Sequence, residues 1–286
     1  MKYIKYICII IILFTLFIIS YDINTSEFKL REDYMYEMPR FIPRKVNNQP
    51  DNVSGVPLTI YQHWHTAMLP QKMKECVYKL IDMNPEFDYY LYDDKESLSF
   101  IMDNFDDDVI DAFNVLKPSA YKSDLWRYCI LYTKGGVYLD IKLYSLNPLL
   151  PIIKENPNIW VKDGNNGTCD NIGICNGFLV SPPKNPVFKE CIDKIVKNCR
   201  FRVLGNSPLS VTGPCLLGKI LERQYGISYI NNTPFKLKWK GKEYIYIQYG
   251  DEQILRSYIQ YRSEQKKTQN DNHYLVLWAK GDIYNY

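Results

Sequence analysis

The chain has 286 residues, of which 46% are hydrophobic, and its formal net charge is only +3. A chain of this length can bury a full core, so we expect it to fold without a partner. The even charge balance, with no long basic stretch between aromatic residues, argues against a nucleic-acid-binding protein.

The first 21 residues differ in composition from the rest of the chain. Lys2 and Lys5 precede an apolar run from Tyr6 to Ile19, which is shorter than the ~20 residues that span a bilayer comfortably. No small-x-small cleavage pattern follows this run. We therefore predict a cytoplasmic tip and an uncleaved signal anchor over residues 1–21. The rest of a single-pass type II membrane protein would then lie in the lumen of the secretory pathway (ER or Golgi). The alternative is a secreted protein whose signal peptide has been removed.

Residues 22–55 mix acids, bases and prolines without a sustained period, which predicts a stem. The folded domain is then expected over residues 56–286. Its first half alternates apolar strands with amphipathic helices, a pattern typical of an α/β domain with a mainly parallel central sheet. The expected strands are 58–61 and 87–92, and the expected helices are 72–83, 98–105 and 109–116.

A helix is predicted from about Ser119 to Lys134, with Ser119 as its N-cap. Gly135-Gly136 would end it, because glycine readily adopts the left-handed conformation that closes helices. An apolar strand follows over residues 137–143, and it carries Asp140.

The second half predicts helices over 187–198 and 215–225, with a polar loop at 264–272. The predicted strands are 158–161, 177–180, 244–249 and 274–278. Of eight cysteines, Cys169 and Cys175 bracket a short polar loop and form the predicted disulfide. No cysteine or histidine spacing fits a structural zinc site.

The polar residues of greatest interest lie in the central helix and the strand after it. Asp124 and Arg127 are three residues apart and share one helix face. The alternative is an exposed ion pair, but their neighbours are apolar on most sides of the helix, which favours burial. Asp140 would lie at the carboxyl edge of the sheet, where open α/β folds bind ligands.

This block resembles the DxD-motif glycosyltransferases, the family 32-like group that includes the Och1-type mannosyltransferases and the α-1,4-galactosyltransferases. Members share a pattern close to A-x-K-x-D-x-x-R-Y-x-x-L-x-x-x-G-G-x-Y-x-D-x-D. The chain matches it at Ala120, Lys122, Asp124, Arg127, Tyr128, Leu131, Gly135, Gly136, Tyr138 and Asp140. Gln62, Trp64 and the Thr212-Gly213-Pro214 segment also resemble landmarks of the family.

The resemblance implies a GT-A type, Rossmann-like domain that binds a nucleotide sugar. It implies transfer of a hexose from a UDP- or GDP-sugar to a glycan or glycolipid acceptor, with retention of configuration. The residues it assigns to catalysis are Asp124, Arg127 and Asp140, and those it assigns to donor binding are Trp64, Tyr138, Lys142 and Gly213.

The chain departs from the family pattern at Lys142, where members carry the last aspartate of the DxD motif. The resemblance implies a divalent metal, Mn²⁺ or Mg²⁺, and the lysine leaves three alternatives open. Its ammonium could replace the charge of the ion. Alternatively, Lys142 could point away, and Asp140 could hold the ion together with His273 or another C-terminal oxygen ligand. The third alternative is a catalytically silent membrane protein that binds a sugar nucleotide or a carbohydrate.

Overall fold

A computed structural model describes residues 35–46, 48, 50–164, 169–268 and 273–285 of the chain. The predicted signal anchor, and the predicted stem up to residue 34, lie outside these residues. None of the helices in the described ranges combines the length and hydropathy that a membrane span requires.

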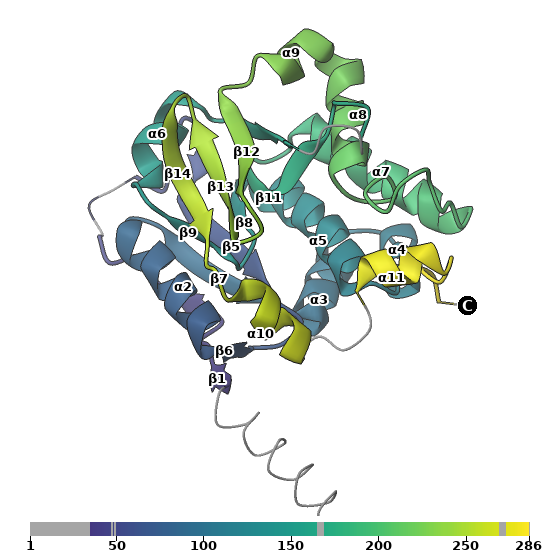
Figure 1. Cartoon of the computed structure of the whole chain (residues 1–286), viewed down its shortest axis with the longest axis horizontal. Helices are drawn as coiled ribbons and strands as arrows, with labels where there is room; N and C mark the ends of the chain where they lie inside the picture. Colours follow the sequence, from purple (N-terminus) through teal and green to yellow (C-terminus); the bar gives the residue numbers. More distant parts are fainter. Residues whose placement is uncertain (1–34, 47, 49, 165–168, 269–272, 286) are drawn as a thin grey trace, which may run out of the picture.

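A ten-stranded mixed sheet runs through the body in the order β2-β7-β5-β8-β11-β10-β12-β13-β14-β9 (Figure 1). Its strands are β2 (Phe41–Ile42), β5 (Thr59–His63), β7 (Asp88–Tyr92), β8 (Gly136–Leu139), β9 (Leu143–Ser145), β10 (Ile159–Lys162), β11 (Ile174–Ser181), β12 (Phe235–Lys240), β13 (Tyr244–Tyr249) and β14 (Glu252–Ser257). The fold is therefore a mixed α/β fold built on one large sheet.

The prediction of a mainly parallel sheet is wrong for the described strands. Only β7 with β5, β5 with β8, and β10 with β12 pair in parallel, and the other neighbours in the sheet are antiparallel. The reason is the length of the connections. Short turns join β12 to β13 and β13 to β14, and a short turn can only reverse the chain, whereas a parallel pair needs a long crossover.

The described part of the predicted stem packs against the body. β1 (Met35–Glu37) pairs with β6 (Met68–Pro70), and β2 adds to the edge of the large sheet beside β7. Met38, between them, is only 2% exposed. β3 (Asn52–Val53) and β4 (Val56–Pro57) form a further two-stranded sheet. The folded body thus includes residues from Met35 onward, ahead of the predicted start at residue 56.

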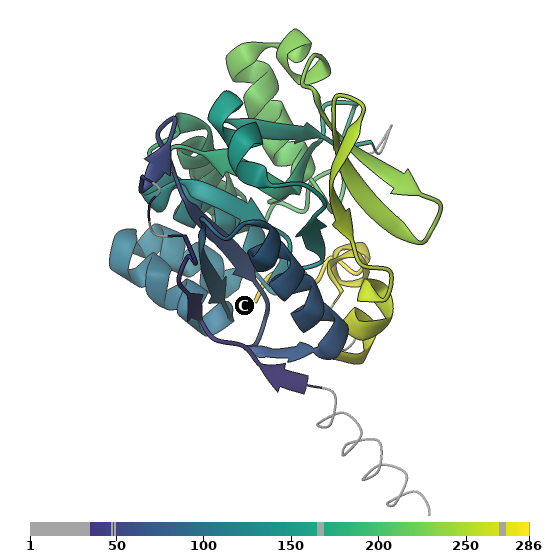
Figure 2. The ribbon, with the colours of Figure 1, turned by 90° about the vertical axis from the view of Figure 1, so that its left-hand side faces the viewer.

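Helices cover both faces of the large sheet (Figures 1 and 2). They are α2 (Gln71–Met83), α3 (Asp94–Asn104), α4 (Asp107–Val115), α5 (Ser119–Lys134), α6 (Leu149–Glu155), α7 (Pro186–Arg200), α8 (Pro214–Tyr225), α9 (Ile227–Asn231), α10 (Tyr261–Thr268) and α11 (Tyr274–Ala279). Alternate residues of β8 supply the two apolar clusters, because side chains of a strand point to opposite faces. Tyr138 joins the cluster around α5, α7 and α8, whereas Val137 and Leu139 join the cluster around α2 and α6.

Two predicted elements near the C-terminus differ from the structure. Residues 274–278, predicted as a strand, form α11, and most of the predicted polar loop at 264–272 belongs to α10 as far as Thr268. The apolar run Tyr274–Ala279 is short, and periodicity alone cannot separate a short buried strand from one helical turn.

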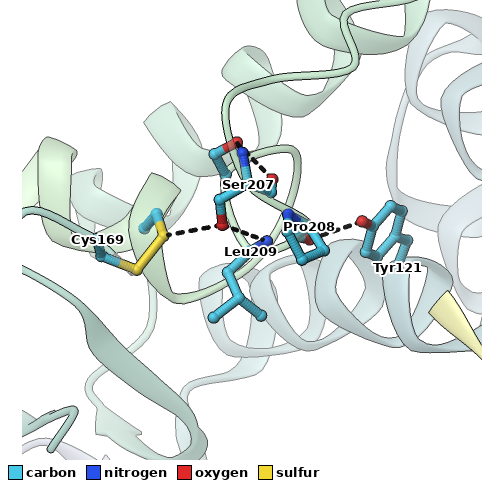
Figure 3. Close-up of a disulfide and its surroundings, with 7 residues drawn as sticks. Tyr121, Cys169, Ser207, Pro208 and Leu209 are labelled. Carbon is cyan, nitrogen blue, oxygen red and sulfur yellow. Dashed lines mark hydrogen bonds between the residues drawn. A yellow bond between two sulfur atoms is a disulfide. The ribbon is translucent and has the colours of Figure 1, made fainter. Parts of the chain in front are cut away.

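The disulfide joins Cys169 to Cys215, so the predicted Cys169–Cys175 pair is wrong (Figure 3). Cys175 is instead a buried free cysteine on β11, where it lies opposite Val161 of β10. Strand pairing holds Cys175 in place, while the first turn of α8 brings Cys215 to Cys169 with a Cα–Cα distance of 5.0 Å.

Candidate functional site

The central helix forms and ends as its sequence predicts. α5 spans Ser119–Lys134, and Gly135 closes it in the left-handed region, with φ of 67° and its N–H bonded to the Leu131 carbonyl. The N-cap is Pro118 rather than the predicted Ser119. A run from Ser123 to Leu131 is buried, and the helix packs between the sheet and α7. Asp124 and Arg127 are therefore buried polar residues and not an exposed pair.

Arg127 is the hub of the site, and every nitrogen of its guanidinium has a protein partner. Nε donates to the Ser123 carbonyl at 3.1 Å, and Nη2 donates to Ser123 Oγ at 2.9 Å and lies 3.3 Å from Asp124 Oδ1. Nη1 donates to the Asn176 carbonyl at 2.6 Å and to Asp140 Oδ1 at 3.4 Å. The guanidinium also stacks 4.3 Å above the Tyr138 ring. Arg127 thus positions its neighbours, since its donors are already used.

Asp124 is held by donors from three separate elements. Oδ1 accepts from Asn176 Nδ2 of β11 at 3.1 Å, and Oδ2 accepts from Thr212 Oγ1 at 2.7 Å, while Arg127 lies beside it on α5. Burial raises the pKa of Asp124, and the charge of Arg127 and these hydrogen bonds offset only part of that shift. This carboxylate ties the helix to the loop ahead of α8.

Asp140 follows the last residue of β8 and lies at the solvent-accessible end of the cluster. Its Oδ1 accepts from Tyr138 OH at 3.0 Å and its Oδ2 accepts from Lys142 Nζ at 2.7 Å. Burial opposes ionisation, but the charges of Lys142 and Arg127 outweigh it and hold the pKa of Asp140 below its ordinary value. The side chains of Asp140 and Lys142 are 23% and 20% exposed, against 7% for Arg127. A ligand would therefore meet Asp140 and Lys142 first.

The parallel part of the sheet places Asp140 where the sequence predicts. β7, β5 and β8 run in the same direction, so His63 at the end of β5 and Asp140 after β8 share one edge. Trp64 follows β5, is 4% exposed, and its ring centroid lies 6.5 Å from that of Tyr261. The Lys142 ammonium lies 5.6 Å from the same Tyr261 ring, so Tyr261 links Trp64 to the cluster. Trp64 Nε1 is buried without a hydrogen-bond partner among the described residues.

Two glycines allow the backbone to approach the carboxylates closely. A Cβ on Gly177 would lie 2.8 Å from Asp140 Oδ2, and one on Gly213 would lie 3.3 Å from Asp124 Oδ2. Gly213 is also the N-cap of α8, which follows Thr212 directly. Larger residues at Gly177 would displace Asp140, so the size of this residue is part of the site.

The disulfide holds the loop that carries Thr212 and Gly213. Cys215 Sγ lies 3.8 Å from Ser207 Oγ, which accepts from Leu209 N at 3.0 Å (Figure 3). The Pro208 carbonyl accepts from Tyr121 OH of α5 at 2.6 Å. The Cys169–Cys215 bond and Tyr121 thus fasten both ends of this loop against the body.

His273 does not join Asp140 in the described structure. It caps α11, where its ring nitrogen accepts from Leu275 N at 3.4 Å and its ring stacks on Tyr274, and it forms no ion pair with Asp140. Burial lowers the pKa of His273, with a smaller contribution from Arg262. His63, at the end of β5, lies 3.1 Å from Asp94 Oδ1 of α3 and so contacts α3 rather than Asp140.

A divalent metal does not fit the residues around Asp140. Lys142 occupies Oδ2, and Tyr138 and Arg127 occupy Oδ1. Among the described residues no group of three or more His, Cys, Asp or Glu side chains is placed to hold a metal ion. An ion at Asp140 would have to approach within ~2.1 Å of a carboxylate oxygen that already contacts an ammonium group.

Sequence reasoning missed four residues of the site: Ser123, Asn176, Gly177 and Tyr261. Asn176 is the third residue of β11 and contacts both Asp124 and Arg127. Because β11 is antiparallel to β8, its start lies at the edge where β8 ends. Asn176, directly ahead of the predicted strand at 177–180, was the available signal, but it is informative only once that antiparallel pairing is known.

Two surface grooves of the described residues lie elsewhere. They have volumes of about 400 and 850 Å³, and residues of α2, such as Lys79 and Asp82, line both. Neither groove includes a residue of the cluster around Arg127. We place the candidate site at that cluster because Arg127 joins two carboxylates there, at the carboxyl edge of the parallel strands.

Residues 70–159 match the family model described as the glycosyltransferase sugar-binding region containing a DXD motif. The chain is 28% identical over 172 residues to inositol phosphoceramide mannosyltransferase 2 of Schizosaccharomyces pombe, covering 57% of this chain and 48% of that protein. It is 29% identical over 209 residues to inositol phosphoceramide mannosyltransferase 3 of the same yeast, covering 72% and 52%. It is 25% identical over 193 residues to the initiation-specific alpha-1,6-mannosyltransferase of Candida albicans, covering 59% and 48%.

The chain spans about half the length of these curated relatives. The matched region holds α5, β8 and Asp140, which are the core of the site. Among solved structures, the PaToxG glycosyltransferase aligns with a TM-score of 0.44 and 14% identity over 62% of this chain and 73% of its own.

Proposed function

Because this chain is related to the DXD-motif glycosyltransferases of the Och1-type mannosyltransferase group, we propose that it is a glycosyltransferase. It transfers a hexose from a nucleoside diphosphate sugar, UDP- or GDP-linked, to a glycan or glycolipid acceptor. The observation that carries the proposal is that Arg127 lies 3.3 Å from Asp124 and 3.4 Å from Asp140, at the carboxyl edge of the sheet. The relatives are named as mannosyltransferases, which supports mannose as the sugar.

In the proposed reaction the bond between the anomeric carbon and the diphosphate oxygen breaks. A new bond forms between that carbon and an acceptor hydroxyl oxygen, and the hydroxyl proton is released. The leaving diphosphate gains negative charge, which a fixed cation in a partly dry site stabilises. We assign transfer with retention of configuration, in line with the family resemblance.

The contacts divide the site residues into two roles. Arg127 and Asp124 are positioning residues, since buried partners occupy the guanidinium and both carboxylate oxygens. Asp140 and Lys142 face solvent and would contact the donor, with Tyr138 supporting Asp140 from within the sheet. Trp64 would stack on the base, and the backbone at Gly213 would border the sugar.

We further assign the body to the GT-A type, with β7, β5 and β8 as its nucleotide-binding strands. Residues 1–21 would anchor it to a membrane as a type II protein, with the body in the secretory lumen. The Cys169–Cys215 disulfide supports that compartment, because disulfides persist where the environment is oxidising.

The test is release of nucleoside diphosphate by the full chain from a panel of UDP- and GDP-hexoses, with glycan and glycolipid acceptors. Wild type should release it, and Asp140→Asn should lower the rate by at least about 100-fold. Asp193→Asn removes a carboxylate from an exposed pair with Lys189 and should leave the rate unchanged. Equal background rates for wild type and Asp140→Asn with every donor would refute the proposal. Tight donor binding without release would instead support a silent binding protein.

A further inference from the structure

Among the described residues of the cluster, Lys142 is the cation whose donors are still available to a ligand. Arg127 uses all of its nitrogens on protein partners, as described above. In the described structure the Lys142 ammonium makes one hydrogen bond, to Asp140 Oδ2 at 2.7 Å. An ammonium carries three donors, so two remain for an incoming group. The side chain of Lys142 is also 20% exposed, against 7% for that of Arg127, which places it at the accessible side of the cluster.

Asp140 fixes the direction in which Lys142 points. The ion pair runs from the residue after β8 to a residue only two positions later, across the turn that leads into β9 (Leu143–Ser145). The Leu143 N–H bonds to the Asp140 carbonyl at 2.8 Å and closes this turn. The side chain of Lys142 therefore lies over the carboxyl edge of the sheet, toward the Tyr261 ring, and not away from the site.

The lysine at position 142 also supplies the positive charge that a metal would have brought to the site. An aspartate at position 142 would contribute −1 and the lysine contributes +1, a difference of two charges. A divalent ion supplies the same difference to a site with two aspartates. Since the residues around Asp140 do not fit a metal, the cation that faces a diphosphate here is the ammonium itself.

We propose that Lys142 binds the diphosphate of the donor directly and stabilises it as it leaves, so that this chain acts without a divalent metal. The inference rests on the proposed function and deepens it. The ligand class is a nucleoside diphosphate and its sugar ester. The oxygens of the diphosphate accept hydrogen bonds from Nζ while Asp140 holds the ammonium in place.

The first test compares binding of UDP and GDP to the metal-stripped full chain, by calorimetry, in EDTA and in Mn²⁺. We expect dissociation constants that agree within about threefold and donor turnover that survives EDTA. Electron paramagnetic resonance should detect no Mn²⁺ bound to the protein beyond that bound by the nucleotide alone. Loss of binding and turnover in EDTA, with recovery in Mn²⁺, would overturn the inference and leave the proposed function standing. Absence of binding and turnover in both conditions would refute both.

The second test uses variants of Lys142. Lys142→Met should weaken nucleoside diphosphate binding in EDTA by at least about tenfold, since a charge-assisted contact is lost. Lys142→Asp should weaken it as much in EDTA and recover part of it in Mn²⁺, because it restores a second carboxylate. Lys189→Met, in an exposed pair on α7, is the matched control and should bind as wild type does. Unchanged binding in Lys142→Met that is folded by circular dichroism would overturn the inference.

Discussion

Asn176 of β11 and Asp124 of α5 are joined by a buried hydrogen bond of 3.1 Å from the amide of the asparagine to the carboxylate. The same side-chain amide donates to Tyr128 OH at 2.7 Å, and the backbone carbonyl of Asn176 accepts from Arg127. Because a carboxylate only accepts, the contact fixes which way the amide of Asn176 faces. Asn176 Oδ1 is left buried and without a partner among the described residues. One residue of the sheet thus orients both charged residues of the helix.

Replacing Asn176 should therefore lower the stability of the folded chain. Asn176→Ala leaves Asp124 Oδ1 and Tyr128 OH without this donor, and we expect the free energy of unfolding to fall by about 1–3 kcal/mol. Urea unfolding measures this change. Asn147→Ala removes an exposed hydrogen bond to Glu252 and should change it by less than about 0.5 kcal/mol. Similar small losses in both variants would contradict the role assigned to Asn176.

Arg127 should be among the most sensitive positions of the described chain. Arg127→Leu removes the cation beside the buried Asp124 and the partly exposed Asp140, so we expect a loss of about 3–5 kcal/mol in the free energy of unfolding. Arg200→Leu breaks an exposed pair with Asp108 and should cost less than about 1 kcal/mol. Denaturant unfolding of both variants gives the comparison. If Arg127→Leu is as stable as Arg200→Leu, the guanidinium is not the hub of the site.

The stabilising effect of Asp140 should depend on pH in the acid range only. Its pKa is lower in the folded than in the unfolded chain, where it is ~3.9. The ionised carboxylate therefore contributes fully to the free energy of unfolding above about pH 4. That contribution is lost as the pH falls through the lower pKa of the folded state. The difference in the free energy of unfolding between wild type and Asp140→Asn should stay constant from about pH 7 to about pH 5 and shrink below about pH 4. A difference that already shrinks between about pH 7 and about pH 5 would show that the pKa of Asp140 is not lowered.

The disulfide should stabilise both the body and the loop of Thr212. It joins residues 46 positions apart, and its removal in Cys169→Ser/Cys215→Ser should lower the free energy of unfolding by about 2–4 kcal/mol. Nucleoside diphosphate binding should weaken as well, because the loop carries Thr212, whose hydroxyl donates a hydrogen bond to Asp124 Oδ2. Cys175→Ala is the control, and a non-reducing peptide map of it should still contain the Cys169–Cys215 pair. A Cys169–Cys175 peptide in wild type would contradict the structure.

Several elements follow from local sequence alone. The helix from Ser119 to Lys134 and its end at Gly135 are confirmed, because a run of helix-forming residues and a glycine in the left-handed region act within a few residues. The helices at 72–83, 187–198 and 215–225 are also confirmed, apart from one or two residues at their ends. The spacing of Asp124 and Arg127 on one helix face needs no tertiary information either.

Other features could not be predicted, since each depends on contacts between distant segments. The antiparallel pairing of β8 with β11 brings Asn176 and Gly177 to Asp140, and no local pattern encodes that pairing. The same holds for the partner of Cys169, because Cys175 is close in sequence but is held in a strand. Residues 35–42 read as part of a stem because the strands that pair with them, β6 and β7, lie far along the chain.

The sequence by itself determined which charged groups this chain carries, that Asp124 and Arg127 share one helix, and that Asp140 comes with the apolar segment after it. It also contained Lys142 in place of an acid. Only the tertiary structure decided what these groups do to one another. Folding saturates Arg127 with partners, lowers the pKa of Asp140 and leaves Lys142 at the accessible edge. The physical reason is that hydrogen bonds and charge interactions act over a few ångströms in space, whatever the separation along the chain.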